Sequence, residues 1–372
     1  MTVARVASSS RCSVLCVLLD YGVNDGDASY VDKEAARHLF LDFIGEPADS
    51  GRRRREGVYE SYRWGATTKP SGAASAPGVP AADGRQTKLL VLDGRYFQNR
   101  SADDMLGPAQ WLWLEEQLND AAPTDLFIIT SGLQLVFTDK RIGEGWRLFP
   151  KSRAKIFRLI SQRKHNRDAM VMFLSGDVHF AEADVTYSCE DASSGEVRVT
   201  PFYDFTSSGM THSVGTQVTP RVAEIAVPWF LHKRPSWAAE MDLAASIEGA
   251  YFGLNFGEVH VEWDQQRIVV TIRDRDGKPT PQRYTLPFSA LRASTLDASA
   301  VPASVAARCA AESVRAVSPA MWVIPGTKAG IVISAAVLTA LALMLRWMAR
   351  AMGCGNDRSG AAGRSPDSRK RR

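Results

Sequence analysis

The sequence predicts an α/β domain in which helices cover β-sheets, and three observations support this prediction. Short apolar strands alternate with helical segments between residues 88 and 179. Residues 257–288 then alternate inward- and outward-facing side chains about short turns, which is typical of antiparallel hairpins. The 372 residues are 45% hydrophobic and 23% charged, as in an ordinary globular chain. This order of elements is typical of an α/β domain in which helices cover sheets.

The alternating elements follow in chain order. Residues 88–97 (KLLVLDGRYF) are apolar enough to predict a buried strand, and residues 102–121 carry acids in a first helical turn. The helical spacing places one apolar face at Leu106, Trp111, Leu114 and Leu118. A strand at 125–132, a helix with a basic outer face at 151–166 and a strand at 169–179 complete the alternation.

Three segments depart from this pattern. Residues 1–19 form an atypical N-terminus, because their longest apolar run, VLCVLL, is shorter than the core of a secretory signal. Residues 66–87 are rich in Ala, Gly, Pro and Ser and predict a flexible surface insertion. Residues 291–320 are rich in Ala and Ser and predict a stalk that follows the folded domain of residues 20–290.

The C-terminal region predicts a membrane anchor. Residues 329–345 carry no charge, and with their flanks the apolar region reaches about 25 residues, where about 20 suffice to cross a bilayer as a helix. We therefore expect a transmembrane helix at 321–348, with a buried core helix as the alternative. The basic tail 349–372 should remain in the cytoplasm by the positive-inside rule. The preceding domain would then be lumenal or extracellular, in a single-pass membrane protein.

Charge and cysteine content exclude some classes of function. The net charge is +4, but the tail from Arg346 onward contributes +6, so the rest of the chain is slightly acidic. The run RRRR at 52–55 lacks interleaved aromatic residues, and we expect no nucleic-acid partner. The five cysteines form no CxxC pair and predict neither a zinc site nor a disulfide framework.

The segment LSGDVHFAE (174–182) carries the most specific chemical signal. Asp177 and His179 follow an apolar strand, and ligand sites of open α/β sheets lie beyond the carboxyl ends of strands. A carboxylate and an imidazole are common ligands of borderline metals, although Ser-Gly-Asp is also ordinary turn chemistry. Arg95 lies at another strand end, where its guanidinium could bind a substrate phosphate or form a structural pair with Asp93.

Several segments together resemble the PhoD-like alkaline phosphatases, a branch of the calcineurin-like metallophosphoesterases. The resemblance extends over residues 20–275. Its segments, in order, are LDYGVNDGDASYVDKEAARHLFLDFIGEP, GRRRREGVYESY, KLLVLDGRYF, MLGPAQWLWLEEQL, IITSGLQLV, GEGWRLFP, FLSGDVHFAEAD, FTSSGMTHS and LNFGEVHVEW. This family implies a layered metallophosphoesterase-like β-sandwich flanked by helices, and a binuclear centre of divalent or trivalent metal ions. Calcium, iron, manganese and zinc are not distinguished by the motifs.

The resemblance also assigns roles to single residues. Asp177 and His179 match the late Gly-Asp-x-His metal motif, and Asp20 matches the last acid of an earlier metal segment. Asn24 matches the asparagine after that segment and is a candidate contact to metal or phosphate. His212 lies in a loop that the family places near the cleft, where it could be catalytic or could anchor the loop. The implied activity is hydrolysis of a small phosphate ester.

The N-terminal part departs from the family. Val17, Leu18 and Leu19 stand where the family has Asp-Asp-His, and the first-strand motif and the Gly-Asp-x-x-Tyr-x-Asp motif are absent. We therefore expect the first strands of the fold to be missing, as in a truncated or mis-started gene product. The alternative to an active enzyme is an inactive, membrane-tethered relic or binding domain derived from the family.

Overall fold

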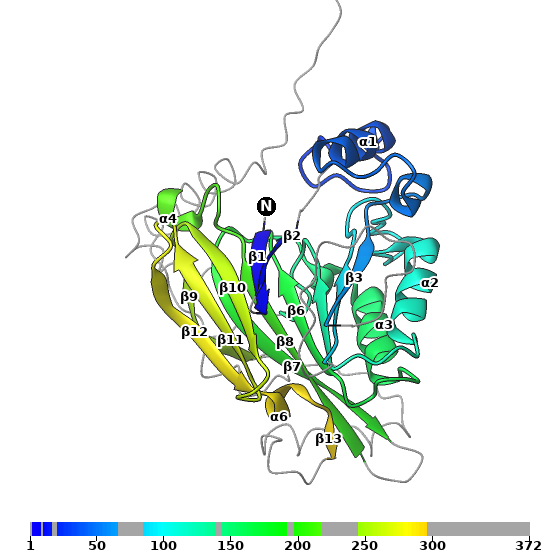
Figure 1. The fold of residues 1–372 in the computed structure, drawn as a ribbon. Coiled ribbons are helices and arrows are strands. Elements are labelled where there is room, and N and C mark those ends of the chain that lie inside the picture. Colours follow the sequence, from blue (N-terminus) through cyan, green and yellow to red (C-terminus); the bar gives the residue numbers. More distant parts are fainter. Residues whose placement is uncertain are drawn as a thin grey trace, which may run out of the picture. The chain divides into compact units, whose positions relative to one another are not determined.

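The computed structural model describes residues 2–8, 10–16, 21–65, 85–137, 143–191, 197–217 and 245–295, which belong to one compact unit. These residues form a mixed α/β fold, which confirms the predicted class (Figure 1). The predicted transmembrane helix at 321–348, the basic tail and most of the stalk lie outside the described residues. Among the residues that are described, no helix is long and apolar enough to cross a membrane.

The larger of two sheets has a parallel centre and antiparallel margins. Its strand order is β3-β4-β5-β6-β8-β7-β9, and β13 pairs with the start of β8. Strands β4, β5, β6 and β8 run parallel to one another. The strands are β3 (Glu60–Trp64), β4 (Thr87–Val91), β5 (Leu126–Thr130), β6 (Met170–Ser175), β7 (Ala181–Asp191), β8 (Val197–Ser207), β9 (Ala245–Tyr251) and β13 (Ser294–Thr295).

The smaller sheet has the order β12-β11-β10-β1-β2. Its strands are β1 (Thr2–Ser8), β2 (Ser10–Cys16), β10 (Asn255–Glu262), β11 (Arg267–Asp274) and β12 (Pro279–Pro287). The antiparallel pairing of β10, β11 and β12 confirms the predicted hairpins. The backbone of the atypical N-terminus also joins this sheet, because β1 pairs in parallel with β10 and antiparallel with β2.

Apolar side chains on both faces of the large sheet arrange the fold in three layers. One face packs against α2 (Gly107–Leu118) and α3 (Pro150–Ser161), and the opposite face packs against the small sheet (Figure 1). The helix-side core includes Trp111, Leu114, Ile156, Phe157, Phe127, Phe173 and Phe202. The core between the sheets includes Ile128, Met172, Phe205, Val259, Val270 and Ile272. All four residues of the predicted apolar face, from Leu106 to Leu118, are buried.

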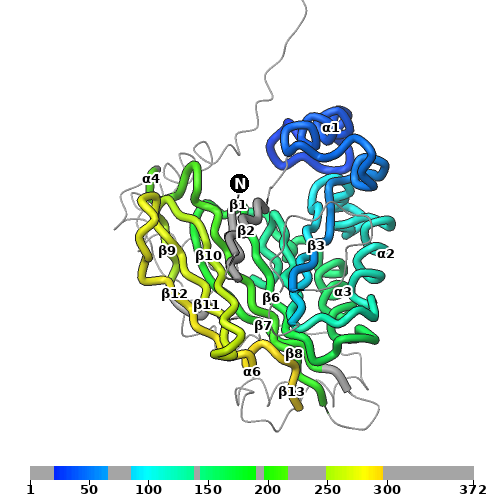
Figure 2. Tube along the Cα trace, viewed as in Figure 1, coloured from blue at the N-terminus to red at the C-terminus, as the bar shows by residue number. Residues whose placement is uncertain are grey.

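Shorter helical elements lie between the strands. They are α1 (Lys33–Phe43), η1 (Gly51–Arg54), η2 (Trp146–Leu148), α4 (Val214–Gln217) and α6 (Phe288–Leu291). Helices α1 and α4 lie at one end of the sheets, whereas α6 and β13 lie at the other (Figures 1 and 2). The end with α4 is where β4, β5, β6 and β8 terminate, so the loops that follow these parallel strands gather there.

Candidate metal site at the strand ends

The turn between β6 and β7 holds the two residues of the Gly-Asp-x-His motif in an uncommon backbone conformation. Asp177 has a φ of 79° and His179 a φ of 60°. L-residues reach this left-handed region at a cost of about 1–3 kcal/mol each, and such residues cluster at functional sites. Aspartate and histidine tolerate the region better than most residues, so the cost is at the lower end. The turn therefore holds both residues at a cost in backbone energy.

The structure brings His179 and His212 together. Their rings lie 4.1 Å apart, centroid to centroid, at an interplanar angle of 44°. The backbone N–H of His179 donates to the hydroxyl of Ser208 (2.9 Å), and the N–H of Val214 donates to the carbonyl of His179 (3.1 Å). These bonds join the turn after β6 to the loop after β8. Two residues that lie 33 positions apart in sequence thus form one imidazole pair.

The environment of the pair favours a neutral His179. Burial, and then repulsion from His212, lower the pKa of His179 from 6.5 to about 4. The imidazole is therefore unprotonated near neutral pH, which is the form that binds metals. The hydroxyl of Thr211 lies 3.0 Å from Nδ1 of His212 and orients that exposed ring.

Asn255 fixes the loop that carries His212, and sequence reasoning did not single it out. Its side-chain oxygen accepts hydrogen bonds from the hydroxyl of Ser207 (2.9 Å) and the N–H of Gly209 (3.4 Å). Its amide donates to the carbonyl of Gly253 (2.8 Å). Asn255 is 2% exposed. It therefore clamps the end of β8 to the β9–β10 connection from inside the protein.

A buried polar layer lies one residue inside these strand ends. The amide of Gln134 donates to Glu182 (2.6 Å) and to the hydroxyl of Thr206 (2.8 Å), which lies 2.7 Å from the hydroxyl of Ser175. These side chains come from the loop after β5 and from β7, β8 and β6. The layer therefore holds the ends of three neighbouring strands, on which the two histidines depend, in fixed register.

Asp204 of β8 belongs to the same interior. It accepts hydrogen bonds from the backbone N–H groups of Leu135 (2.9 Å) and Val136 (3.1 Å). Burial raises the pKa of Asp204, although Ser175 and the two N–H groups act in the opposite direction. Arg153 of α3 closes the same loop through the carbonyls of Leu135 and Val136.

The segment of Asn24 lies beside a different strand end. Asn24 is exposed, and the next residue, Asp25, forms an ion pair of 3.7 Å with Arg95, which follows β4. The guanidinium of Arg95 is buried and also pairs with Glu144 and donates to Gln98 (3.1 Å). The charge of Arg95 is therefore balanced within the protein. Asp93 accepts a hydrogen bond from the backbone N–H of Arg95 (3.0 Å).

Asp93 organises this part of the strand edge. Its buried carboxylate accepts four hydrogen bonds, from the hydroxyl of Tyr21 (2.5 Å) and the N–H groups of Val58 (2.9 Å), Arg95 (3.0 Å) and Tyr96 (3.0 Å). Burial and the neighbouring carboxylate raise the pKa of Tyr21. Asp93 is thus saturated by donors and connects three stretches of chain to the end of β4.

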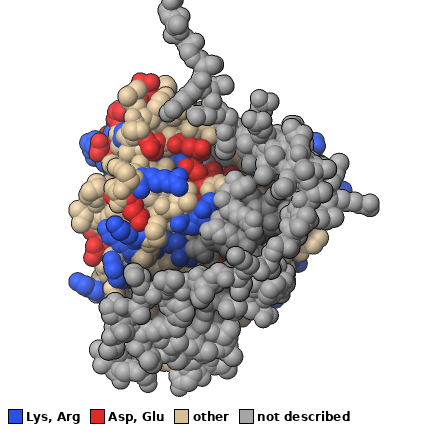
Figure 3. Space-filling model, turned by 180° about the vertical axis from the view of Figure 1, so that it is seen from behind, with Lys and Arg blue, Asp and Glu red and all other residues tan. Residues whose placement is uncertain are grey.

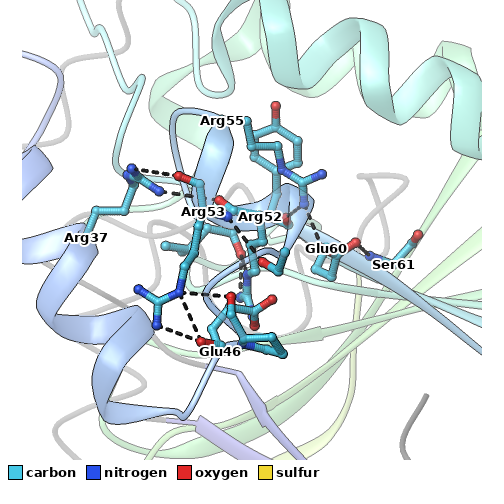
Figure 4. A network of polar contacts seen from close by, with 11 residues as sticks. Arg37, Glu46, Arg52, Arg53, Arg55, Glu60 and Ser61 are labelled. Atoms are coloured by element: carbon cyan, nitrogen blue, oxygen red, sulfur yellow. Dashed lines mark hydrogen bonds and ion pairs between the residues drawn. The ribbon is translucent and has the colours of Figure 1, made fainter. Parts of the chain in front are cut away.

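The arginine run 52–55 is structural. Arg52 donates to the carbonyl of Val58 and Arg53 to the carbonyl of Glu46 (Figure 4). Arg54 donates to the carbonyl of Asp49. Arg55 pairs with Glu60 at 3.0 Å. On the described surface seen from behind, Lys and Arg lie among Asp and Glu (Figure 3).

The predicted site residues therefore fall into two groups. His179 and His212 meet at the ends of β6 and β8, with Asp177 in the same turn, whereas Asn24 and Arg95 lie at the end of β4. Asp20 is outside the described residues. The strands β4 and β6 are separated by β5, so about 10 Å of sheet lies between the two groups.

The residues of the first group carry donor types that metal ions accept. Asp177, His179 and His212 offer a carboxylate and two imidazoles from two adjacent loops, the donor types that zinc, iron and manganese accept. Within the part of the chain that the structure describes, no three His, Cys, Asp or Glu side chains are already gathered as a metal-binding group.

Comparisons with known proteins leave the family assignment as a prediction. No protein-family model matches the chain. No curated protein sequence matches it at a significant level.

Proposed function

We propose that the protein is a metal-dependent phosphoric ester hydrolase of the PhoD-like type, anchored in a membrane by the segment 321–348. One observation carries this proposal: the imidazoles of His179 and His212 are in contact at the carboxyl ends of two parallel strands, next to Asp177. Ligand sites of α/β sheets lie at this edge. The order of the PhoD-like segments along the chain supports the same assignment.

The residues at this edge of the sheet would have different roles in the proposed metal centre. Asp177, His179 and His212 would hold the metal, and Asp20 would complete the centre. Asn24, at the separate end of β4, would contact another part of the substrate. A bound metal would supply Lewis-acid polarisation of the phosphoryl oxygen and a more acidic water. His179 enters this role without first losing a proton at neutral pH, because burial keeps its pKa low. Thr211 and Ser208 would keep the two histidine loops oriented.

A disulfide supports the lumenal or extracellular placement of the domain. Cys189 of β7 is disulfide-bonded, although the cysteine pattern did not predict such a bond. Disulfides persist in oxidising compartments and are rare in the cytosol. The basic tail after residue 348 would then remain on the cytoplasmic side.

The proposal is tested by metal content and turnover in the full-length protein. We expect Asp177→Asn and His179→Ala to lower bound metal and hydrolysis of a chromogenic phosphate ester together, in assays with added calcium, iron, manganese or zinc. His165→Ala is the matched control, because His165 is an exposed imidazole after α3. Unchanged metal stoichiometry in Asp177→Asn would remove Asp177 from the ligand set.

The second candidate is an inactive, membrane-tethered domain. It is favoured by the apolar residues Val17, Leu18 and Leu19, which stand where the family has metal ligands. A folded full-length protein that binds no metal and shows no metal-dependent hydrolysis above the blank would identify this candidate. Turnover that His179→Ala abolishes would exclude it.

A further inference from the structure

A small apolar cluster lies apart from the two main cores of the described protein. The buried rings of Phe180 and Phe252 lie 5.3 Å apart, centroid to centroid, at an interplanar angle of 46°. The partly buried side chains that pack against these rings are Val178, Val214 and Ala250. Because these three side chains keep some exposure, the cluster presents part of its apolar surface to solvent.

The cluster borders the histidine pair. Val178 directly precedes His179 in one loop, and Val214 follows His212 by two positions in the other. The N–H of Val214 donates to the carbonyl of His179 (3.1 Å), so the two loops are joined where the cluster meets the pair. Met210, two positions before His212, is 41% exposed and adds an adaptable apolar side chain to the second loop. An ester with its phosphoryl group at the histidines would therefore have apolar side chains beside its organic part.

The segments around the pair offer no cationic side chain. The described residues 176–181, 207–217 and 250–256 contain no Lys or Arg, and Asp177 is the one acid among them. A second phosphate or a carboxylate on the substrate would find no ion partner in these segments, and its desolvation would be costly. An apolar group would instead be stabilised in proportion to the area that it removes from water.

We propose that Val178, Met210, Val214 and Ala250 form an apolar subsite that binds the alkyl or aryl group of the ester. The substrate is then a phosphate ester of an apolar alcohol, and not an ester that carries further charged groups. This inference rests on the proposed hydrolase function, since the phosphoryl group would be held at the histidine pair. It deepens that function by giving the class of alcohol that the site accepts.

The test compares two stable analogues, methylphosphonate and hexylphosphonate, which share a head group and differ in the length of the apolar chain. Their binding to the full-length protein is measured by calorimetry with manganese present. We expect hexylphosphonate to bind at least tenfold more tightly, which corresponds to about 1.4 kcal/mol. Burial of about two methylene groups is enough to give this difference.

Two substitutions make the subsite more polar with little change in volume. Val178→Thr and Met210→Gln should each reduce the preference for hexylphosphonate about threefold, because each replaces apolar surface by a polar group. Val197→Thr and Leu112→Gln are the matched controls, because Val197 is partly buried at the opposite end of β8 and Leu112 is exposed on α2. Met210 is exposed, so Met210→Gln tests the subsite even if Val178→Thr impairs folding.

Equal affinity for the two phosphonates, or no binding of hexylphosphonate, would overturn the apolar subsite. A preference that Leu112→Gln reduces as strongly as Met210→Gln would overturn it as well. The hydrolase function is judged separately, by release of phosphate from methyl phosphate in the wild-type protein and in His179→Ala. Hydrolysis without the preference for the longer chain would refute the subsite alone, whereas the preference without hydrolysis would support the subsite and refute the hydrolase.

Discussion

The hydrogen bond from Tyr21 to Asp93 gives a prediction about how the Asn24 segment is held at the strand edge. Replacement of Tyr21 by Phe removes the hydroxyl that donates to the Asp93 carboxylate at 2.5 Å. A hydrogen bond to a charged group contributes about 1.5–3 kcal/mol to stability. The carboxylate keeps its three N–H donors, so no acceptor is left without a partner. We therefore expect a loss near the lower limit, about 1.5–2 kcal/mol.

Equilibrium unfolding in urea, followed by tryptophan fluorescence, measures this loss in the full-length protein. Tyr30→Phe is the matched control, because Tyr30 lies nine residues away in the same segment and its hydroxyl forms no hydrogen bond with another described residue. We expect Tyr30→Phe to change stability by less than about 0.5 kcal/mol. Equal effects of the two substitutions would refute the assignment of Asp93 as the anchor of this segment.

Two further predictions concern pH and topology. Burial raises the pKa of Asp204 in the folded protein above its usual value near 4; the charge of Glu182 adds to this rise and that of Arg153 opposes it. The stability that Asp204 contributes is therefore fully present below the unfolded-state pKa near 4, and it is lost as the pH rises through the folded-state pKa. Asp204→Asn should therefore shrink the difference between urea midpoints at pH 4.5 and pH 8, and an unchanged difference would contradict the shift. A glycosylation acceptor introduced before Trp322 should be modified and one after Arg350 should not, while the reverse pattern would invert the proposed orientation.

Local pattern was sufficient for the elements that bury an apolar face. The helix predicted at 102–121 is α2, which begins only at Gly107 and ends at Leu118. It begins late because the preceding residues form a turn in which the backbones of Asn99 and Asp104 pair. The strand predicted at 88–97 ends at Val91, since the following residues fold around the carboxylate of Asp93. The strand predicted at 169–179 ends at Ser175 for a related reason, the left-handed turn that begins at Asp177.

The sequence pattern was insufficient where the position of an element depends on contacts with residues far away in the sequence. Helix α1 is amphipathic, but its placement depends on a distant contact. The carboxylate of Glu34 accepts a hydrogen bond from the hydroxyl of Tyr96 (2.7 Å), which lies 62 residues further along the chain. Strand β7 contains the buried acids Glu182 and Asp184, which no apolar alternation would predict. Their burial is possible because partners such as Gln134 come from another loop.

The candidate site shows the same division between local and distant information. The motif around Asp177 and His179 is contiguous and could be recognised from the sequence. The contact between His179 and His212 and the clamp by Asn255 arise from loops that only the parallel strand order brings together. Arg95 illustrates the limit, because its residue type suggests phosphate binding while its buried pairing with Glu144 argues for a structural role.

The two groups of predicted site residues can be tested separately because they lie at different strand ends. The histidine pair follows β6 and β8, whereas the Asn24 segment and Arg95 lie at the end of β4. Strands β4 and β6 are two positions apart in the sheet, about 10 Å. His179→Ala should therefore lower metal content without the loss of stability expected of Tyr21→Phe. Tyr21→Phe should likewise leave metal content unchanged, and a variant that lost both properties would show that the edge acts as a single site.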